Sequence, residues 1–441
     1  MESSIDRLRL RHILTLAVLC LLLLGVLMVQ SASVRVGGPI TWSWSPDAWR
    51  HLWMVLVGFA VYLIVGRIND RRLLPLSAPP SKSPVYWLLA AAAILGISVF
   101  LPVIGSSGGG AQRWVAFGPV RFQPSELAKW AVVLWLAYRL CRPETRYQGF
   151  LRGTCLTLAP VGFLVLLTVI EDFGTAALIG GVSLLMLVVG RVPWLHLAAI
   201  VPPAFAGAFL FVYTEPYRWK RMTSFLQPFA DARGEGYHMV QSLLSFTTGG
   251  LLGTGMGNGV QKLGYLPEDT TDFIFAVICE ELGLFGAALV ISLYGAMLFV
   301  AWQALRASAS TPSSATSTLS TDTESRNTFS QLLIFGITAM VVSQALINIA
   351  VATVSVPTKG LSLPLVSFGG TGVIMTCAAL GLLHAIIRRK ELEMSDAPDP
   401  AASTTDSPSY TPAGSQTDSP SIPSVSTPAA ASVSLSGAQP A

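Results

Sequence analysis

The chain has 441 residues, of which 52% are hydrophobic and only 12% charged, about half the usual share of charge. Too few polar side chains are present to cover a soluble surface, and the mean hydropathy of +0.59 indicates that lipid surrounds most of the protein. These values exclude a nucleic-acid-binding domain, a secreted disulfide scaffold and a disordered hub. The five cysteines show no C-x-x-C spacing, so neither a disulfide framework nor a zinc site is indicated.

Long apolar runs alternate with short polar segments along most of the chain. Because a helix needs about 20 apolar residues to cross the hydrocarbon core, the pattern predicts an all-α polytopic membrane protein with about ten transmembrane helices. The expected spans are residues 12–31, 50–67, 85–104, 125–141, 153–170, 174–190, 193–213, 272–304, 330–353 and 365–387.

The N-terminus has features of both a signal peptide and a membrane anchor. Arg7, Arg9 and Arg11 precede the first apolar run, which ends in Gln30-Ser31-Ala32-Ser33. The run is long for a signal peptide and many spans follow it, so an uncleaved first helix is the better interpretation. With ten spans, Lys and Arg are more frequent in the short segments on the N-terminal side, which predicts that both termini are cytoplasmic.

The polar segments divide the chain. Residues 1–11 are expected to be a cytoplasmic N-terminus, and residues 12–390 the transmembrane domain. Within it, residues 214–271 form a large extracytoplasmic loop before the eighth span, rich in Gly, Pro and aromatic residues, and residues 307–328 form a Ser/Thr-rich cytoplasmic loop. Residues 391–441, mostly Ser, Thr, Pro and Ala, are expected to be a disordered cytoplasmic tail.

Asp272 belongs to the strongest polar cluster, which runs from Tyr265 to Gly283 into the eighth span. Its position where a polar cap meets an apolar helix favours a proton acceptor, while capping of the helix N-terminus is an equal alternative. Glu280 and Glu281 are adjacent carboxylates inside the apolar run. They indicate either a functional site or a buried pair with basic partners.

A second cluster precedes and enters the fourth span. Glu126 and Lys129 are three residues apart, so they share a helix face and can pair, and a structural ion pair is the simpler interpretation. Arg113 follows the glycines at 108–110 and could present a cation to a phosphate.

Two further segments carry polar residues. In Glu171-Asp172-Phe173-Gly174-Thr175 the acids could bind a cation or a base, and helix capping by Asp172 is the alternative. Asn348 precedes a segment, residues 357–371, that contains Lys359 and Ser367. Its Gly, Pro and Ser residues suggest a broken helix whose free N–H groups could meet an anion, or else a plain turn.

These residues place cations, acids and apolar walls on the expected outer side. The mixture suits a lipid-linked anion such as a pyrophosphate on a polyprenyl tail. Composition alone does not choose between a protein that moves such a lipid and one that reacts with it.

Taken together, these blocks resemble the SEDS family of bacterial cell-wall proteins, the FtsW/RodA group. The division-type branch looks closer than the elongation-type branch, because of Pro228-Phe229-Ala230-Asp231, Gly236-Tyr237-His238 and Pro357-Thr358-Lys359-Gly360. The matching stretches occur in family order: 30–33, 113–129, 171–175, 228–253, 265–283 and 348–370.

The resemblance implies a fold of about ten spans in the bacterial cytoplasmic (inner) membrane at the division septum. It implies a peptidoglycan glycosyltransferase that polymerises lipid II onto a growing glycan strand, with a class B penicillin-binding protein and other divisome proteins as partners. No cofactor is implied with certainty, although a divalent cation (Mg or Mn) could take part. A lipid II flippase and a scaffold that only recruits the transpeptidase are the alternatives.

The resemblance also implies roles for residues. Asp272, in the T-D-F-I-F motif, is the expected catalytic residue. The expected substrate-binding residues are Arg113, Glu126, Lys129, Asp172, Glu280, Lys359 and Ser367. Thr270 stands where the family often has His. Phe368, Thr371 and Gly372 stand where the family often has Tyr, Ser and Ser, so the resemblance leaves the fine contacts with the substrate open.

Overall fold

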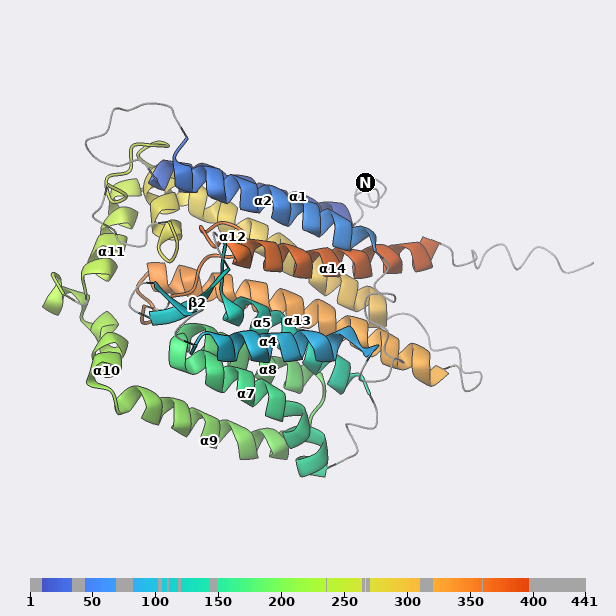
Figure 1. Cartoon of the computed structure of the whole chain (residues 1–441). Helices are drawn as coiled ribbons and strands as arrows, with labels where there is room; N and C mark the ends of the chain where they lie inside the picture. Colours follow the sequence, from blue (N-terminus) through green and yellow to red (C-terminus); the bar gives the residue numbers. More distant parts are fainter. Residues whose placement is uncertain are drawn as a thin grey trace, which may run out of the picture. The chain divides into compact units, whose positions relative to one another are not determined.

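The computed structural model is shown in Figure 1. Most of the predicted cytoplasmic N-terminus and tail lie outside the residues that it describes. The described residues are 10–33, 44–68, 82–101, 105–108, 111–117, 120–142, 149–234, 236–263, 266, 270–309, 320–358 and 360–395.

A helix lies in each of the ten predicted spans. These are α1 (Leu10–Ala32), α2 (Pro46–Arg67), α4 (Pro84–Ser98), α5 (Pro124–Leu140), α7 (Leu156–Glu171), α8 (Phe173–Val189), α9 (Trp194–Tyr213), α12 (Ile274–Ala309), α13 (Ser320–Ala352) and α14 (Thr371–Ser395). A π-helical turn, η2 (Gly149–Cys155), leads into α7.

Seven helices of the described chain are long and apolar enough to cross a membrane. The remaining three of the ten, α4, α5 and α8, have 15, 17 and 17 residues. The chain is therefore a multi-pass helical membrane protein, and a total of ten spans remains a prediction.

A small antiparallel sheet corrects the all-α expectation. It consists of β1 (Gly105–Gly108), β2 (Ala111–Phe117) and β3 (Val120–Phe122), in the order β1-β2-β3. The predicted third span extends to residue 104, whereas α4 ends at Ser98. Pro102 and the glycines after it disfavour a helix, and the sheet carries Arg113 toward the N-terminus of α5.

The segment from 214 to 271 contains helices of its own. It holds α10 (Pro216–Thr223), the 3₁₀ turns η3 (Ser224–Leu226) and η4 (Pro228–Asp231), and α11 (Tyr237–Gly249). α11 packs against α12.

The loop after α11 enters a break in α12. Gly283 has a φ of 64°, which interrupts the helix and frees the carbonyls before it. The N–H groups of Thr254 and Gly255 donate to the carbonyls of Glu280 and Glu281, at 2.9 and 3.0 Å. A membrane helix tolerates such a break only where protein groups satisfy the freed carbonyls, and this loop supplies them.

α13 lies at the centre of the helices. It packs against α5, α8, α12 and α14, while α2 lies along α14 and α1 along α12 (Figure 1). α9 is the least buried of the seven long apolar helices, with only 6% of its apolar window covered.

The helices on both sides of the predicted loop 307–328 are longer than expected. α12 continues to Ala309 and α13 begins at Ser320. Residues 310–319, which remain between them, lie outside the described residues. Ala-rich residues extend α12 because Ala has the highest helix propensity. Likewise α14 continues to Ser395, five residues into the predicted tail.

Candidate functional site

Asp272 lies in the turn that leads into α12, and the loop before α14 holds the backbone of this turn. The hydroxyl of Ser367 donates to the carbonyl of Thr271 at 2.6 Å. The N–H of Phe368 donates to the carbonyl of Thr270 at 2.9 Å. Two segments about a hundred residues apart in sequence therefore form one structural element around the carboxylate.

Asn348 of α13 attaches this turn to the centre of the protein. Its side chain has no exposed surface. Its Nδ2 donates to the carbonyl of Asp272 at 2.8 Å and to that of Leu361 at 2.7 Å. One amide thus holds both the backbone of Asp272 and the loop that faces it.

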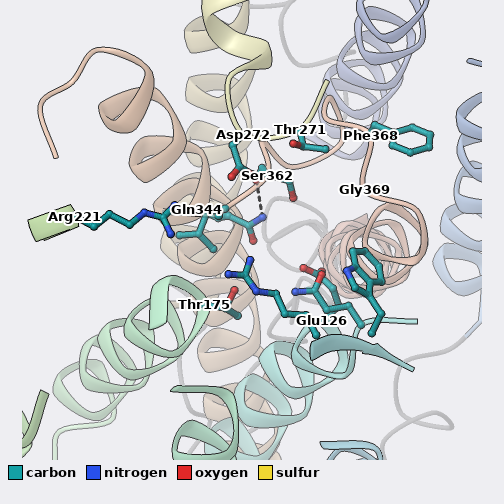
Figure 2. Close-up of a pocket in the computed structure, with 14 residues that line it drawn as sticks. Glu126, Thr175, Arg221, Thr271, Asp272, Gln344, Ser362, Phe368 and Gly369 are labelled. Atoms are coloured by element: carbon teal, nitrogen blue, oxygen red, sulfur yellow. Dashed lines mark hydrogen bonds between the residues drawn. The ribbon is translucent and has the colours of Figure 1, made fainter. Parts of the chain in front are cut away.

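Asp272 faces a cavity of about 340 Å³. Figure 2 shows Asp272 and Arg221 reaching into this space from different elements, with Glu126 and Gln344 on other sides. The cavity lies at one end of the helices, near the N-termini of α5, α8 and α14. Its lining residues are Arg113, Trp114, Gln123, Glu126, Thr175, Arg221, Thr271, Asp272, Gln344, Gly360, Leu361, Ser362, Phe368 and Gly369.

Arg113 lies close to Asp272 because residue 360 has no side chain. A Cβ on Gly360 would lie 2.9 Å from Nη1 of Arg113 and 3.6 Å from Oδ2 of Asp272. Nε of Arg113 donates to the carbonyl of Glu171 at 3.0 Å, which orients the guanidinium. The cavity therefore places a cation and a carboxylate on either side of one small gap.

Glu126 and Lys129 form the ion pair that their spacing predicts. Nζ of Lys129 lies 2.9 Å from Oε1 of Glu126 and donates to Oε1 of Gln344 at 2.7 Å. Gln344 in turn donates to the carbonyl of Ser362 at 2.8 Å. Lys129 is only 1% exposed and does not line the cavity, whereas Glu126 does. Burial and two partners keep the ammonium from the cavity surface, which argues against direct contact between Lys129 and a substrate.

Asp172 is the N-cap of α8. Its Oδ1 accepts the N–H of Thr175 at 3.1 Å, and its Oδ2 accepts the hydroxyl of Thr175 at 2.7 Å. Both oxygens are engaged and the residue is 4% exposed. The structure thus has the capping arrangement that the sequence offered as the alternative to ion binding.

Glu280 and Glu281 both point into the protein and have no exposed surface. Oε1 of Glu280 accepts the N–H groups of Val260 and Gln261, at 2.8 and 3.2 Å. Glu281 forms an ion pair of 2.6 Å with Lys262, which is also buried. Neither acid lines the cavity around Asp272, so Glu280 holds the loop after α11 and does not face the expected substrate site.

Of the two predicted substrate-binding residues before α14, the structure describes Ser367 but not Lys359. Ser367 is 1% exposed, and its hydroxyl accepts the N–H of Leu363 at 2.7 Å in addition to its bond to Thr271. It supports the turn of Asp272 from behind rather than lining the cavity. Lys359 lies outside the described residues.

Arg221 and Gln344 are among the lining residues that were not predicted from the sequence. Arg221 comes from α10, in a segment whose charges of both signs offered no way to choose one. Gln344 precedes Asn348 by four residues, so the two share a face of α13. A pair of amides with that spacing in an apolar helix was a signal that could have been used.

The described residues contain no group of three or more His, Cys, Asp or Glu side chains that could hold a metal ion. Two carboxylates, those of Glu126 and Asp272, line the cavity, and Glu126 already pairs with Lys129. The positive charge on the cavity wall comes from Arg113 and Arg221.

The fold and the site define a class: a multi-pass helical membrane protein with a charged cavity at one end of its helices. Residues 11–392 match the family model of FtsW, RodA and SpoVE, described as cell cycle proteins. The chain belongs to this family.

Curated relatives match over most of the chain. A protein of Saccharophagus degradans, named probable peptidoglycan glycosyltransferase FtsW, is 34% identical over 394 residues, covering 88% of this chain and 94% of its own. A protein of Halomonas elongata with the same name is 36% identical over 379 residues, covering 84% and 88%.

Solved structures share the fold. A chain of a peptidoglycan synthase complex, described for its structural coordination of polymerization and crosslinking, has a TM-score of 0.61 and 25% identity, covering 86% of this chain and 97% of its own. The rod shape determining protein RodA of Thermus thermophilus has a TM-score of 0.57 and 24% identity, covering 86% and 96%.

Proposed function

We propose that this chain is a peptidoglycan glycosyltransferase that polymerises lipid II during septal cell-wall synthesis. The family membership and the curated relatives support this activity. The observation that carries the assignment to a site is the cavity in which Asp272 lies beside the guanidinium of Arg113.

The reaction joins two lipid-linked sugars. The 4-hydroxyl of the lipid II GlcNAc attacks the anomeric carbon of MurNAc at the lipid-linked end of the growing strand. The bond from that carbon to the pyrophosphate oxygen breaks, and undecaprenyl pyrophosphate leaves with the electron pair. An α-linked donor giving a β-1,4 bond implies inversion in a single displacement.

Such a displacement needs a base and positive charge. Asp272 takes the proton of the attacking hydroxyl as general base. Arg113 lies where negative charge develops on the leaving pyrophosphate, and preorganised charge of this kind stabilises a transition state. Glu126 and the Gln344 network hold the opposite wall of the cavity.

A divalent cation, Mg²⁺ or Mn²⁺, is a further proposal. Mg²⁺ in enzymes is often bound by one or two carboxylates together with substrate phosphates. Glu126 and Asp272 are the two carboxylates of the cavity wall that could hold it.

The membrane location, the topology and the partners of the protein are also proposals. The protein spans the bacterial cytoplasmic membrane at the division septum with both termini inside and residues 214–271 outside. Its partners are a class B penicillin-binding protein, which supplies the transpeptidase, and other divisome proteins. The solved relative from a peptidoglycan synthase complex supports such a pairing.

The flippase alternative relied on carboxylates inside the membrane and on the broken segment between the ninth and tenth spans. Glu280 and Glu281 are both committed to protein partners in the structure, one to backbone N–H groups and one to Lys262. This arrangement favours an enzyme whose reactive carboxylate, Asp272, lies in the cavity.

The test is polymerisation of lipid II by the purified protein with its class B partner, the transpeptidase site being blocked. Asp272→Asn is compared with wild type and with Asp47→Asn, which changes an exposed acid in the first turn of α2. Glycan strands from wild type and Asp47→Asn, and a loss of about 10²- to 10⁴-fold in Asp272→Asn, are expected. Equal strands from Asp272→Asn would remove this carboxylate from the chemistry. Movement of lipid II between leaflets with no strands from wild type would favour the flippase.

A further inference from the structure

A second cavity of about 310 Å³ adjoins the one that contains Asp272. It is lined by the end of α7, the start of α8, the end of α9 and α10. Three lining residues, Arg113, Arg221 and Gly360, belong to both cavities. The two arginines therefore stand at the boundary between a polar chamber and its neighbour.

The second cavity combines apolar walls with cationic groups. Val169, Ile170, Phe211, Val212 and Met222 supply the apolar surface. Three guanidinium groups, those of Arg113, Arg218 and Arg221, line it against two carboxylates, those of Glu171 and Asp172. An anionic headgroup attached to a hydrocarbon chain matches this combination better than a free sugar does.

The three arginines are not equivalent. Arg218 lies 3.9 Å from the ring centroid of Phe211 and donates to the carbonyl of Phe211 at 3.2 Å, so its guanidinium is fixed on α9. Arg221 donates through Nε to the hydroxyl of Thr358 at 3.2 Å. No carboxylate of the described residues forms an ion pair with Arg221, and this residue lines both cavities.

We infer that Arg221 and Arg113 together bind the pyrophosphate of a polyprenyl-linked sugar at the boundary of the two cavities. The sugar lies in the chamber of Asp272, and the first part of the lipid chain lies in the second cavity. This inference rests on the proposed function, because it takes the glycosyl donor as the ligand.

The geometry gives each arginine a task. A guanidinium offers a planar fork of donors that matches the oxygens of a phosphate. Arg113 lies on the side of Asp272, with only the space at Gly360 between them. Arg221 approaches from α10, and its bond to Thr358 sets the direction of the fork. Two forks from different elements fix a pyrophosphate so that its sugar faces Asp272.

The direct test measures binding rather than turnover. Undecaprenyl pyrophosphate and undecaprenol are titrated into the purified full-length protein in detergent. Arg221→Ala is compared with wild type and with Lys220→Ala, which removes the neighbouring exposed cation of α10 that lines neither cavity. Arg221→Ala is expected to weaken binding of the pyrophosphate lipid about 10- to 100-fold and to leave undecaprenol unchanged. Lys220→Ala is expected to bind both as wild type does.

Two further variants separate a binding role from a folding role. Arg221→Lys keeps the charge but loses the fork, and Thr358→Val removes the orienting acceptor. Both are expected to fold as wild type by thermal unfolding and to bind the pyrophosphate lipid less tightly. The inference is overturned if Arg221→Ala binds undecaprenyl pyrophosphate as tightly as wild type does. It is also overturned if wild type binds undecaprenol as tightly as undecaprenyl pyrophosphate.

Failure of the pyrophosphate site can be distinguished from failure of the proposed function. In buffer without divalent cations, Asp272→Asn is expected to bind undecaprenyl pyrophosphate as wild type does, and in the polymerisation assay it is expected to make no strands. If Asp272→Asn polymerises and Arg221→Ala loses binding, the base assignment fails and the pyrophosphate site stands. If wild type polymerises and Arg221→Ala binds normally, the site fails and the function stands.

Discussion

The side-chain amide of Asn348 donates a hydrogen bond of 2.8 Å to the backbone carbonyl of Asp272. The same nitrogen donates to Leu361 at 2.7 Å, so a residue inside α13 controls the separation of two walls of the cavity. This bond places an amide that is buried in the protein behind the proposed base, without contact to the reacting atoms.

Replacing Asn348 by Ala is expected to lower kcat for strand synthesis about 10- to 100-fold, because small displacements of a catalytic group have effects of this size. The free energy of unfolding is expected to fall by about 1–3 kcal/mol, since two buried carbonyls lose their donor. Polymerisation kinetics and thermal unfolding measure the two effects. Asn258→Ala is the control, because Asn258 is exposed. An unchanged kcat in Asn348→Ala would show that the amide does not position Asp272.

Replacing Gly360 by Ala tests the gap between Arg113 and Asp272. The new methyl would lie 2.9 Å from Nη1 of Arg113, so the flexible end of that side chain must move. The protein is expected to fold normally, with a fall of about 10-fold in kcat/KM, because the cation leaves its place beside the carboxylate. Gly295→Ala in α12 is the matched control, since a Cβ there meets nothing within 4 Å. Equal kcat/KM in both variants contradicts the role of the gap.

The Glu126–Lys129 pair is expected to be structural. Lys129→Met alone leaves Glu126 charged and largely buried, so a loss of about 3–5 kcal/mol in stability is expected. The double variant Glu126→Gln with Lys129→Met is expected to recover most of this loss, because no buried charge then lacks a partner. Thermal unfolding of the three proteins measures both steps. A double variant as unstable as Lys129→Met would mean that Lys129 contributes through contacts other than the pair.

The buried pair of Lys262 and Glu281 ties the loop after α11 to α12. Neither side chain has exposed surface, and they lie 2.6 Å apart. Lys262→Met is expected to destabilise the protein by about 3–5 kcal/mol. The matched control is Lys220→Met, which breaks an exposed pair with Asp231 and is expected to cost about 0–1 kcal/mol. Chemical denaturation in detergent compares the two, and equal losses would contradict the structural role of the buried pair.

Much of the helical pattern could be predicted from the sequence because lipid imposes simple rules. Every predicted span contains a helix, since about 20 apolar residues without breaks have no other satisfactory conformation in a bilayer. The ends of the helices were less predictable. The sheet at Gly105–Phe122 and the extension of α13 to Ser320 depend on pairing and packing that apolar length does not encode.

The site was partly predictable. Arg113, Glu126 and Asp272 line the same cavity, and their prominence came from polar residues beside apolar runs. Asp172, Glu280 and Lys129 were equally prominent but are bound to protein groups. A polar residue at a membrane edge looks the same in sequence whether its partner is the substrate, a helix end or another side chain.

The sequence by itself determined that this chain crosses a membrane many times and carries the blocks of its family, because hydropathy and motif order are properties of the linear chain. Only the tertiary structure decided which polar residues share a chamber. Arg221 and Asp272 lie 51 residues apart in sequence and line the same cavity, and one loop lies beside both of them, since its Thr358 accepts from Arg221 and its Gly360 faces Asp272. Such contacts depend on helix packing and on hydrogen bonds such as that of Asn348, which no local pattern specifies.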